Sequence, residues 1–184
     1  ARARRQPAAC GVGRRPRRAR EVRGGTGMAL RNEKDALLSA MEEAFERKAW
    51  HGPNLRGAIR GLDPAVACHR PGPGRHSIWE LVVHAAYWKY AVRRRLVGDK
   101  RGSFAVKGSN WFSRPDEPSP AAWAQDVALL RAEHRALMKV ARAIDPRGLH
   151  RPSSGSRVTP AALLRGIAFH DIYHAGQIQL LKRL

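Results

Sequence analysis

Two histidines near the C-terminal end of the chain, His170 and His174, have the spacing of metal ligands on a helix. Residues four apart lie one above the other on the same helical face, so both imidazoles can point toward one spot. Neutral imidazole nitrogens bind divalent metals at about 2 Å, and two ligands fixed on one rigid helix lose little entropy on binding. No residue after His174 is His, Cys, Asp or Glu, so a further protein ligand must lie upstream.

The best upstream candidate is His84, in a helix predicted from residue 78 to about residue 97. Ser77 and Glu80 have the spacing of a capping box, which marks the start of this helix, and His84 falls on its apolar side. Three imidazoles leave a position open for water or a substrate, as in catalytic rather than structural metal sites. The alternative is that each histidine is a core residue hydrogen-bonded to the backbone.

Two further residues are candidates for chemistry, Asp171 and His134. Asp171 follows His170 where the zinc-protease motif His-Glu-x-x-His has its glutamate base. Aspartate is one methylene shorter, so a surface position or a role in supporting a ligand is favoured over a role as general base. His134 lies on the apolar side of the third predicted helix. It is a candidate for a fourth ligand or an acid–base group, although a lone histidine is more often a hydrogen-bonded core residue.

The hydrophobic periodicity predicts an all-α fold, a four-helix bundle, with no strand pattern to rival it. Serine or threonine followed by proline marks the start of the third and fourth helices. The helices are expected from residue 32 to about 50, from 78 to about 97, from 120 to a break at 145–148, and from 160 to 184. The predicted inner face of the last helix consists of Leu163, Ile167, His170, His174, Ile178 and Leu181.

A long loop, residues 99–118, joins the second and third predicted helices. It is rich in Gly, Ser and Pro, but Phe104, Trp111 and Phe112 are too apolar for a solvated linker. We therefore expect this loop to pack over one end of the bundle.

Residues 1–27 contain nine arginines and one acid, Glu21, with little that could pack, so a disordered basic tail is predicted ahead of a domain over residues 28–184. Three interpretations compete: a translated leader upstream of a true start at Met28, an organellar presequence, or a basic arm for nucleic acid. The start at Met28 is favoured. The absence of serine argues against a transit peptide, and no apolar stretch of signal-peptide length occurs.

The chain has a formal net charge of +20, which raises the prospect of anionic partners. The run Arg93-Arg94-Arg95 points in directions about 100° apart on a helix, so it does not form a nucleic-acid stripe. Two cysteines cannot build a disulfide framework or a thiolate zinc site, and no stretch of about 20 apolar residues could span a membrane. We expect a soluble, reduced, cytoplasmic protein with no membrane partner.

Three stretches of sequence resemble the DinB/YfiT-like superfamily: residues 50–56 (WHGPNLR), 76–90 (HSIWELVVHAAYWKY) and 170–178 (HDIYHAGQI). The resemblance covers the chain from about residue 30 to its end. It implies a four-helix bundle with a divalent metal, often zinc or nickel, held by one histidine of the second helix and two of the last. The matching positions are His84, His170 and His174. Some members of this superfamily are thiol-dependent transferases, others are thiol-dependent isomerases or hydrolases, and members often dimerise.

The leading hypothesis is a metal-dependent enzyme that activates a low-molecular-weight thiol or water for a small-molecule substrate, with thiol S-transfer favoured. A basic domain would suit an anionic thiol, and a homodimer is expected from the resemblance. One alternative is a non-catalytic stress-response or nucleic-acid-binding protein, although nucleic acid is not the favoured partner. Another is a metal-dependent hydrolase that uses Asp171.

Overall fold

The computed structural model describes residues 25–100, 102–114, 119–152 and 156–184. Within these ranges the chain forms six α-helices and one 3-10 turn, with no strand beyond an isolated bridge between Ser109 and Trp111. The predicted all-α class is confirmed. The basic tail predicted over residues 1–27 lies outside the described residues as far as residue 24.

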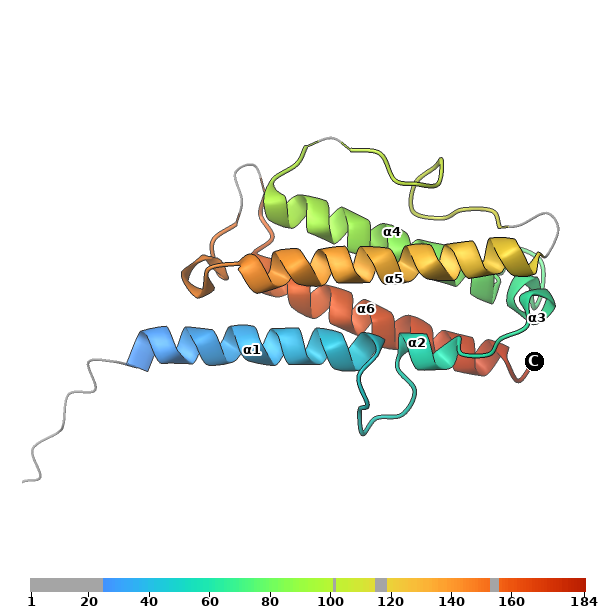
Figure 1. Ribbon diagram of the computed structural model, residues 1–184, viewed down its shortest axis with the longest axis horizontal. Coiled ribbons are helices and arrows are strands. Elements are labelled where there is room, and N and C mark those ends of the chain that lie inside the picture. The colour runs from blue at the N-terminus through green and yellow to red at the C-terminus, as the bar shows by residue number, and fades with distance from the viewer. Residues whose placement is uncertain (1–24, 101, 115–118, 153–155) are drawn as a thin grey trace, which may run out of the picture.

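Four of the helices are long, and they pack side by side (Figure 1). α4 packs against both α5 and α6, and α6 also packs against α1. The colour gradient in Figure 1 shows that α4 and α5 run in one direction while α1 and α6 run in the opposite one. Their bounds are Gly25–Phe45 for α1, Ile78–Val97 for α4, Pro120–Ala143 for α5 and Pro160–Leu181 for α6.

The first helix begins and ends earlier than the predicted range of residues 32–50. Just past its last residue, Phe45, the chain is held by Asn54, whose amide nitrogen donates to the carbonyl of Arg47 at 2.7 Å. The Asn54 side-chain oxygen also accepts from Gly57 and so caps α2 (Leu55–Ala58). One side chain therefore holds the segment after α1 and caps the start of α2.

The caps predicted for the remaining long helices are present. Ser77 and Glu80 form both bonds of the capping box, and Gly98, with φ of 79°, ends α4. Ser119 and Thr159 cap α5 and α6, each followed by proline. Two short elements complete the fold, α3 (Pro64–Cys68) and η1 (Pro146–Gly148).

The connection between α4 and α5 covers the side of α4, so the prediction that it packs over one end of the bundle is wrong. Because the two helices run in the same direction, the chain must return along the length of α4 (Figure 1). Phe104 and Phe112 pack on Tyr87 with ring centroids 5.5 Å away in each case, and Phe112 is buried. These contacts lie at the middle of α4, next to His84.

The buried face of α6 agrees only in part with the predicted one: Ile167, His174 and Ile178 are buried, whereas Leu163, His170 and Leu181 are half-buried. Asp171 lies near its centre with only 1% of its surface exposed, whereas His170 is partly exposed. The reason is that α6 packs against both α1 and α4, so a wider arc of the helix is covered than a single stripe predicts. The buried residues of α6 are Ala161, Leu164, Ile167, Ala168, Asp171, His174, Ala175 and Ile178.

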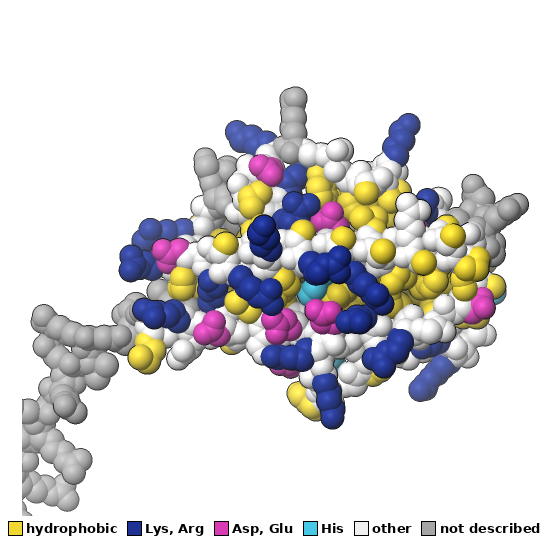
Figure 2. Space-filling model, viewed as in Figure 1, with side chains coloured by type: hydrophobic (Ala, Val, Ile, Leu, Met, Phe, Trp, Pro, Cys, Tyr) yellow, Lys and Arg dark blue, Asp and Glu magenta, His cyan; other side chains and the backbone are white. Residues whose placement is uncertain are grey.

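The basic side chains do not gather in one place on the face drawn in Figure 2, where Lys and Arg are scattered among acidic and apolar residues. In the part of the chain that the structure describes, no helix combines the length and hydropathy needed to cross a bilayer.

Candidate metal centre

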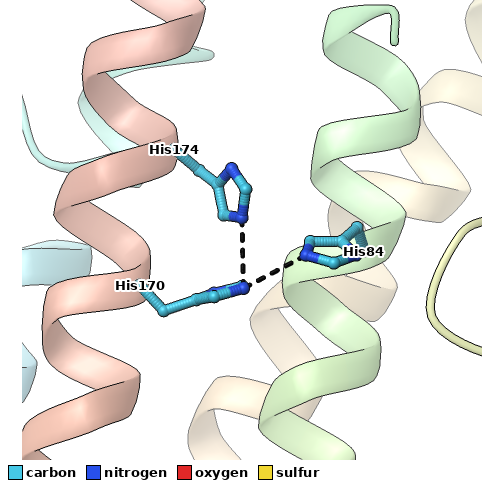
Figure 3. Close-up of side chains that lie close together, drawn as sticks. All are labelled: His84, His170 and His174. Atoms are coloured by element: carbon cyan, nitrogen blue, oxygen red, sulfur yellow. Dashed lines mark hydrogen bonds between the residues drawn. The ribbon is translucent and has the colours of Figure 1, made fainter.

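His84 from α4 and both histidines of α6, His170 and His174, converge on one point (Figure 3). The Nε2 atom of His170 lies 3.1 Å from Nε2 of His84 and 3.1 Å from Nε2 of His174. All three ligand atoms lie within 4.8 Å of one another. We call these three residues the histidine triad.

In His84 and His174 a hydrogen bond at Nδ1 determines whether the inward-facing Nε2 carries a proton. Nδ1 of His84 lies 2.7 Å from the carbonyl oxygen of Asn110, and Nδ1 of His174 lies 2.6 Å from Oε1 of Gln177. Both partners are acceptors, so each Nδ1 must carry the proton. Each inward Nε2 is then a lone pair, which is the form that binds a metal.

This arrangement fits a cation better than it fits hydrogen bonds within the triad. A neutral His170 has one proton, which can satisfy only one of the two lone pairs that face its Nε2. Its Nδ1 atom is buried with no hydrogen-bond partner among the described residues. A divalent ion placed between the three nitrogens would accept a lone pair from each of them, so the residues present fit such an ion.

Burial keeps the triad in its neutral form. Desolvation, with a smaller effect of the neighbouring histidines, lowers the pKa of His170 to about 3. Desolvation also lowers the pKa of His174 to about 4, partly opposed by its bond to Gln177. Burial also lowers the pKa of His84, partly opposed by its bond to Asn110. At neutral pH no proton competes with a metal for these rings.

The loop between α4 and α5 supplies contacts to His84 that the sequence did not reveal. Trp111 stacks on His84 at 3.9 Å and on His76 at 3.6 Å, so the indole lies between two imidazoles. Asn110 has a left-handed backbone with φ of 63°, uncommon for a residue with a side chain, and its Oδ1 accepts from Trp88 at 3.0 Å. Asparagine's tolerance of this region was the only local signal.

Gln177 is a further residue whose role was missed, although it lies inside the motif that begins at His170. Its side chain orients His174, and its Nε2 donates to the hydroxyl of Tyr173 at 3.1 Å. Three positions separate Gln177 from His174, which places both on one face of α6 and could have indicated the contact.

The structure does not bring Asp171 into the triad, and Asp171 is not at the surface. Its carboxylate is bonded to the ammonium of Lys89 on α4, and both side chains are almost fully buried. Burial raises the pKa of Asp171 and lowers that of Lys89, while each charge opposes the shift of the other. Oδ2 of the carboxylate is thus engaged by Lys89, Oδ1 is buried with no hydrogen-bond partner among the described residues, and Asp171 is not part of the cluster of ligand atoms.

His134 also stays apart from the triad. It is buried and stacks on Phe45 of α1 at 3.8 Å, and neither ring nitrogen has a partner among the described residues. Desolvation first, and then the charge of Lys89, lower its pKa to about 2. The structure therefore places His134 in the core, with no contact to the three ligand candidates.

Comparison with known proteins agrees with this geometry. The sequence model of the DinB superfamily matches residues 47–178, which is well over half of the 184-residue chain and includes all three histidines. No curated protein and no solved structure gives a significant match to the chain. The chain belongs to the DinB superfamily.

Proposed function

We propose that the histidine triad binds one divalent metal ion, zinc or nickel, and that the four long helices are the four-helix bundle of the superfamily built around it. The observation that carries this proposal is the approach of three Nε2 atoms, two of them fixed as lone pairs by Asn110 and Gln177. An ion held by three imidazoles keeps an open position and lowers the pKa of a thiol or water bound there.

The protein's own residues would bind and orient the reactants. Asn110 and Gln177 hold the rings of His84 and His174 so that these rings need not reorganise. Trp111 covers one face of His84, and the apolar surroundings exclude water from that side. Rigid positioning of this kind is the usual protein contribution at an open metal site.

Thiol S-transfer is the reaction that we propose first. A pocket of about 380 Å³ borders His174, and no Asp or Glu is among the described residues that line it. Attack by water is commonly assisted by a general base at hydrogen-bond distance, and none of the described carboxylates lines this pocket. In S-transfer the thiol sulfur forms a bond to an electrophilic carbon, the leaving group departs with its electron pair, and the thiol proton passes to solvent.

Metal content is the first test. Untagged protein should bind one equivalent of Zn²⁺ or Ni²⁺, measured by elemental analysis and by calorimetric titration of the metal-free form. His170→Ala should lose stoichiometric binding and keep its helical circular dichroism, whereas His51→Ala, at an exposed position outside the triad, should match the wild type. Full metal binding by His170→Ala would refute the ligand assignment.

Activity is the second test. Metal-loaded protein should accelerate the reaction of cysteine or coenzyme A with an aryl halide, followed by absorbance, and the acceleration should be absent in His170→Ala. A metal-loaded protein that hydrolyses an activated ester while leaving every thiol untouched would support the hydrolase alternative over S-transfer.

A further inference from the structure

The pocket beside the triad has walls from four separate parts of the chain. They are residues 71–76, Leu81 of α4, Trp111 and the last turns of α6. His174 belongs to the wall, so a molecule in the pocket borders the triad directly. The volume of about 380 Å³ is at the small end of ligand sites and suits a molecule with one ring or a short chain.

Most of this wall is apolar. Leu81 from α4 and Leu180 and Leu181 from α6 line the pocket together with Pro71. The two faces of the Trp111 indole are already occupied by His76 and His84, so the edge of the ring is the part left for a ligand. Such a surface favours an apolar body over a polar one.

The polar groups in the wall differ in what they can still offer. Both ends of the Gln177 side-chain amide are already hydrogen-bonded, because its oxygen accepts from His174 and its nitrogen donates to Tyr173. The hydroxyl oxygen of Tyr173 accepts that bond, which leaves the hydroxyl proton free to donate.

The charged group at the pocket is a cation. Arg75 lines the pocket, and no ion pair of its guanidinium occurs within the described ranges. The closest acid along the chain is Glu80, which is buried and bonded to Arg70 and to the backbone of Ser77. The wall therefore presents hydrogen-bond donors and a positive charge with no carboxylate to balance them.

We propose that this pocket binds the second substrate of the reaction at the triad, and that this substrate has an apolar body with one anionic end. Arg75 binds the anion, assisted by the hydroxyl of Tyr173, and the leucines bind the body. The apolar body then points away from Arg75, along the wall that contains His174. The assignment rests on the proposed function, and it adds the class of substrate and the residue that selects it.

A matched pair of ligands tests the proposal, 3-phenylpropanoate and its uncharged amide, which have the same shape. Calorimetry should show the acid binding roughly fivefold more tightly than the amide, as expected for an exposed guanidinium partner. Arg75→Gln should remove this preference, Arg75→Lys should retain part of it, and Arg165→Gln, an exposed arginine of α6 outside the pocket, should leave it unchanged.

The same titrations are run on metal-free protein, because a carboxylate could also bind a metal directly. Preference for the acid that persists without metal and disappears in Arg75→Gln supports the proposal. Equal binding of acid and amide overturns it, and so does a preference that depends on metal and survives Arg75→Gln. Metal analysis of each variant separates the two ideas: intact metal binding without acid preference refutes only the substrate class, whereas acid preference in a protein that binds no metal refutes only the metal centre.

Discussion

Two groups of buried polar residues lie next to each other on α4 and α6, and they have opposite chemistry. His84 and Lys89 are five residues apart on α4, and His170 and Asp171 are consecutive on α6. The histidine triad brings together three groups of the same kind at the wall of a pocket. The Lys89–Asp171 pair joins opposite charges in the core, with exposures of 0% and 1%.

The difference shows that one pair of helices can carry two separate polar groups, one that stabilises the core and one that is suited to bind a ligand. In the Lys89–Asp171 pair each charge offsets the burial of the other, although Oδ1 of Asp171 has no hydrogen-bond partner among the described residues. Phe45 adds a cation–π contact, with Lys89 Nζ 4.7 Å from its ring centroid. In the triad the single proton of a neutral His170 can satisfy only one of the two lone pairs that face it, and in our proposal a divalent cation complements all three nitrogens.

Removing one member of the buried pair should give the largest effect. Lys89→Met leaves the Asp171 carboxylate uncompensated in the core, and the free energy of unfolding should fall by about 3 to 5 kcal/mol. The double variant Lys89→Met/Asp171→Leu should recover most of that loss in denaturant titrations. Additive losses from the two substitutions would mean that the pair is not a self-contained unit.

Removing a member of the triad should change the stability of the metal-free protein little and should abolish its stabilisation by metal. Zn²⁺ at about one hundred times its dissociation constant should stabilise the wild type by about 2.7 kcal/mol. His84→Ala should lose this gain while the metal-free protein changes much less, as measured by thermal unfolding with and without metal. A gain that survives in His84→Ala would show that the metal binds elsewhere.

The residues that orient the triad should have a smaller effect on affinity. Gln177→Leu removes the acceptor that holds His174, and metal affinity should fall about tenfold in a competition titration. Gln179→Leu, two positions further along α6 and outside these contacts, is the matched control. Equal affinities for both variants would argue against an orienting role for Gln177.

The most gradual expected effect is the pH dependence contributed by His134, which is small over any one pH unit. Its pKa is about 2 in the folded state, below its ordinary value near 6.5. Below pH 6.5 the unfolded chain therefore binds a proton at His134 that the folded protein does not bind. Its contribution to stability is present above pH 6.5 and is lost as the pH falls. Between pH 6.5 and pH 4, stability should fall less steeply in His134→Phe, by about 1 kcal/mol per pH unit, in denaturant titrations of metal-free protein.

Local signals were enough to predict the helix starts, because a cap and the turn it begins are adjacent in sequence. Ser77, Ser119 and Thr159 each cap the helix that was expected to follow. The spacing of His170 and His174 likewise follows from one helical turn. His84 can reach these two residues only if α4 packs against α6. The apolar faces of the two predicted helices suggested this packing, and the structure contains it.

The remaining features depend on contacts that no local pattern contains. Burial of Lys89 and Asp171 is tolerable only because they meet across two helices, and single-helix periodicity assigned Asp171 to a less buried position. The buried face of α6 is wider than the predicted stripe because the helix is covered on more than one side. The conformation of Asn110 and the stacking of Trp111 are set by α4, on which the loop lies.

The common direction of α4 and α5 has a consequence for how such a site can diversify. A 20-residue helix is about 30 Å long, so a chain that must re-enter at the same end cannot use a tight hairpin and has to travel back over that distance. Here the obligatory return passes over His84 and brings Asn110 and Trp111 to it. Insertions and deletions in this crossing would therefore reshape the entrance of the site while the helices that hold the ligands stay unchanged.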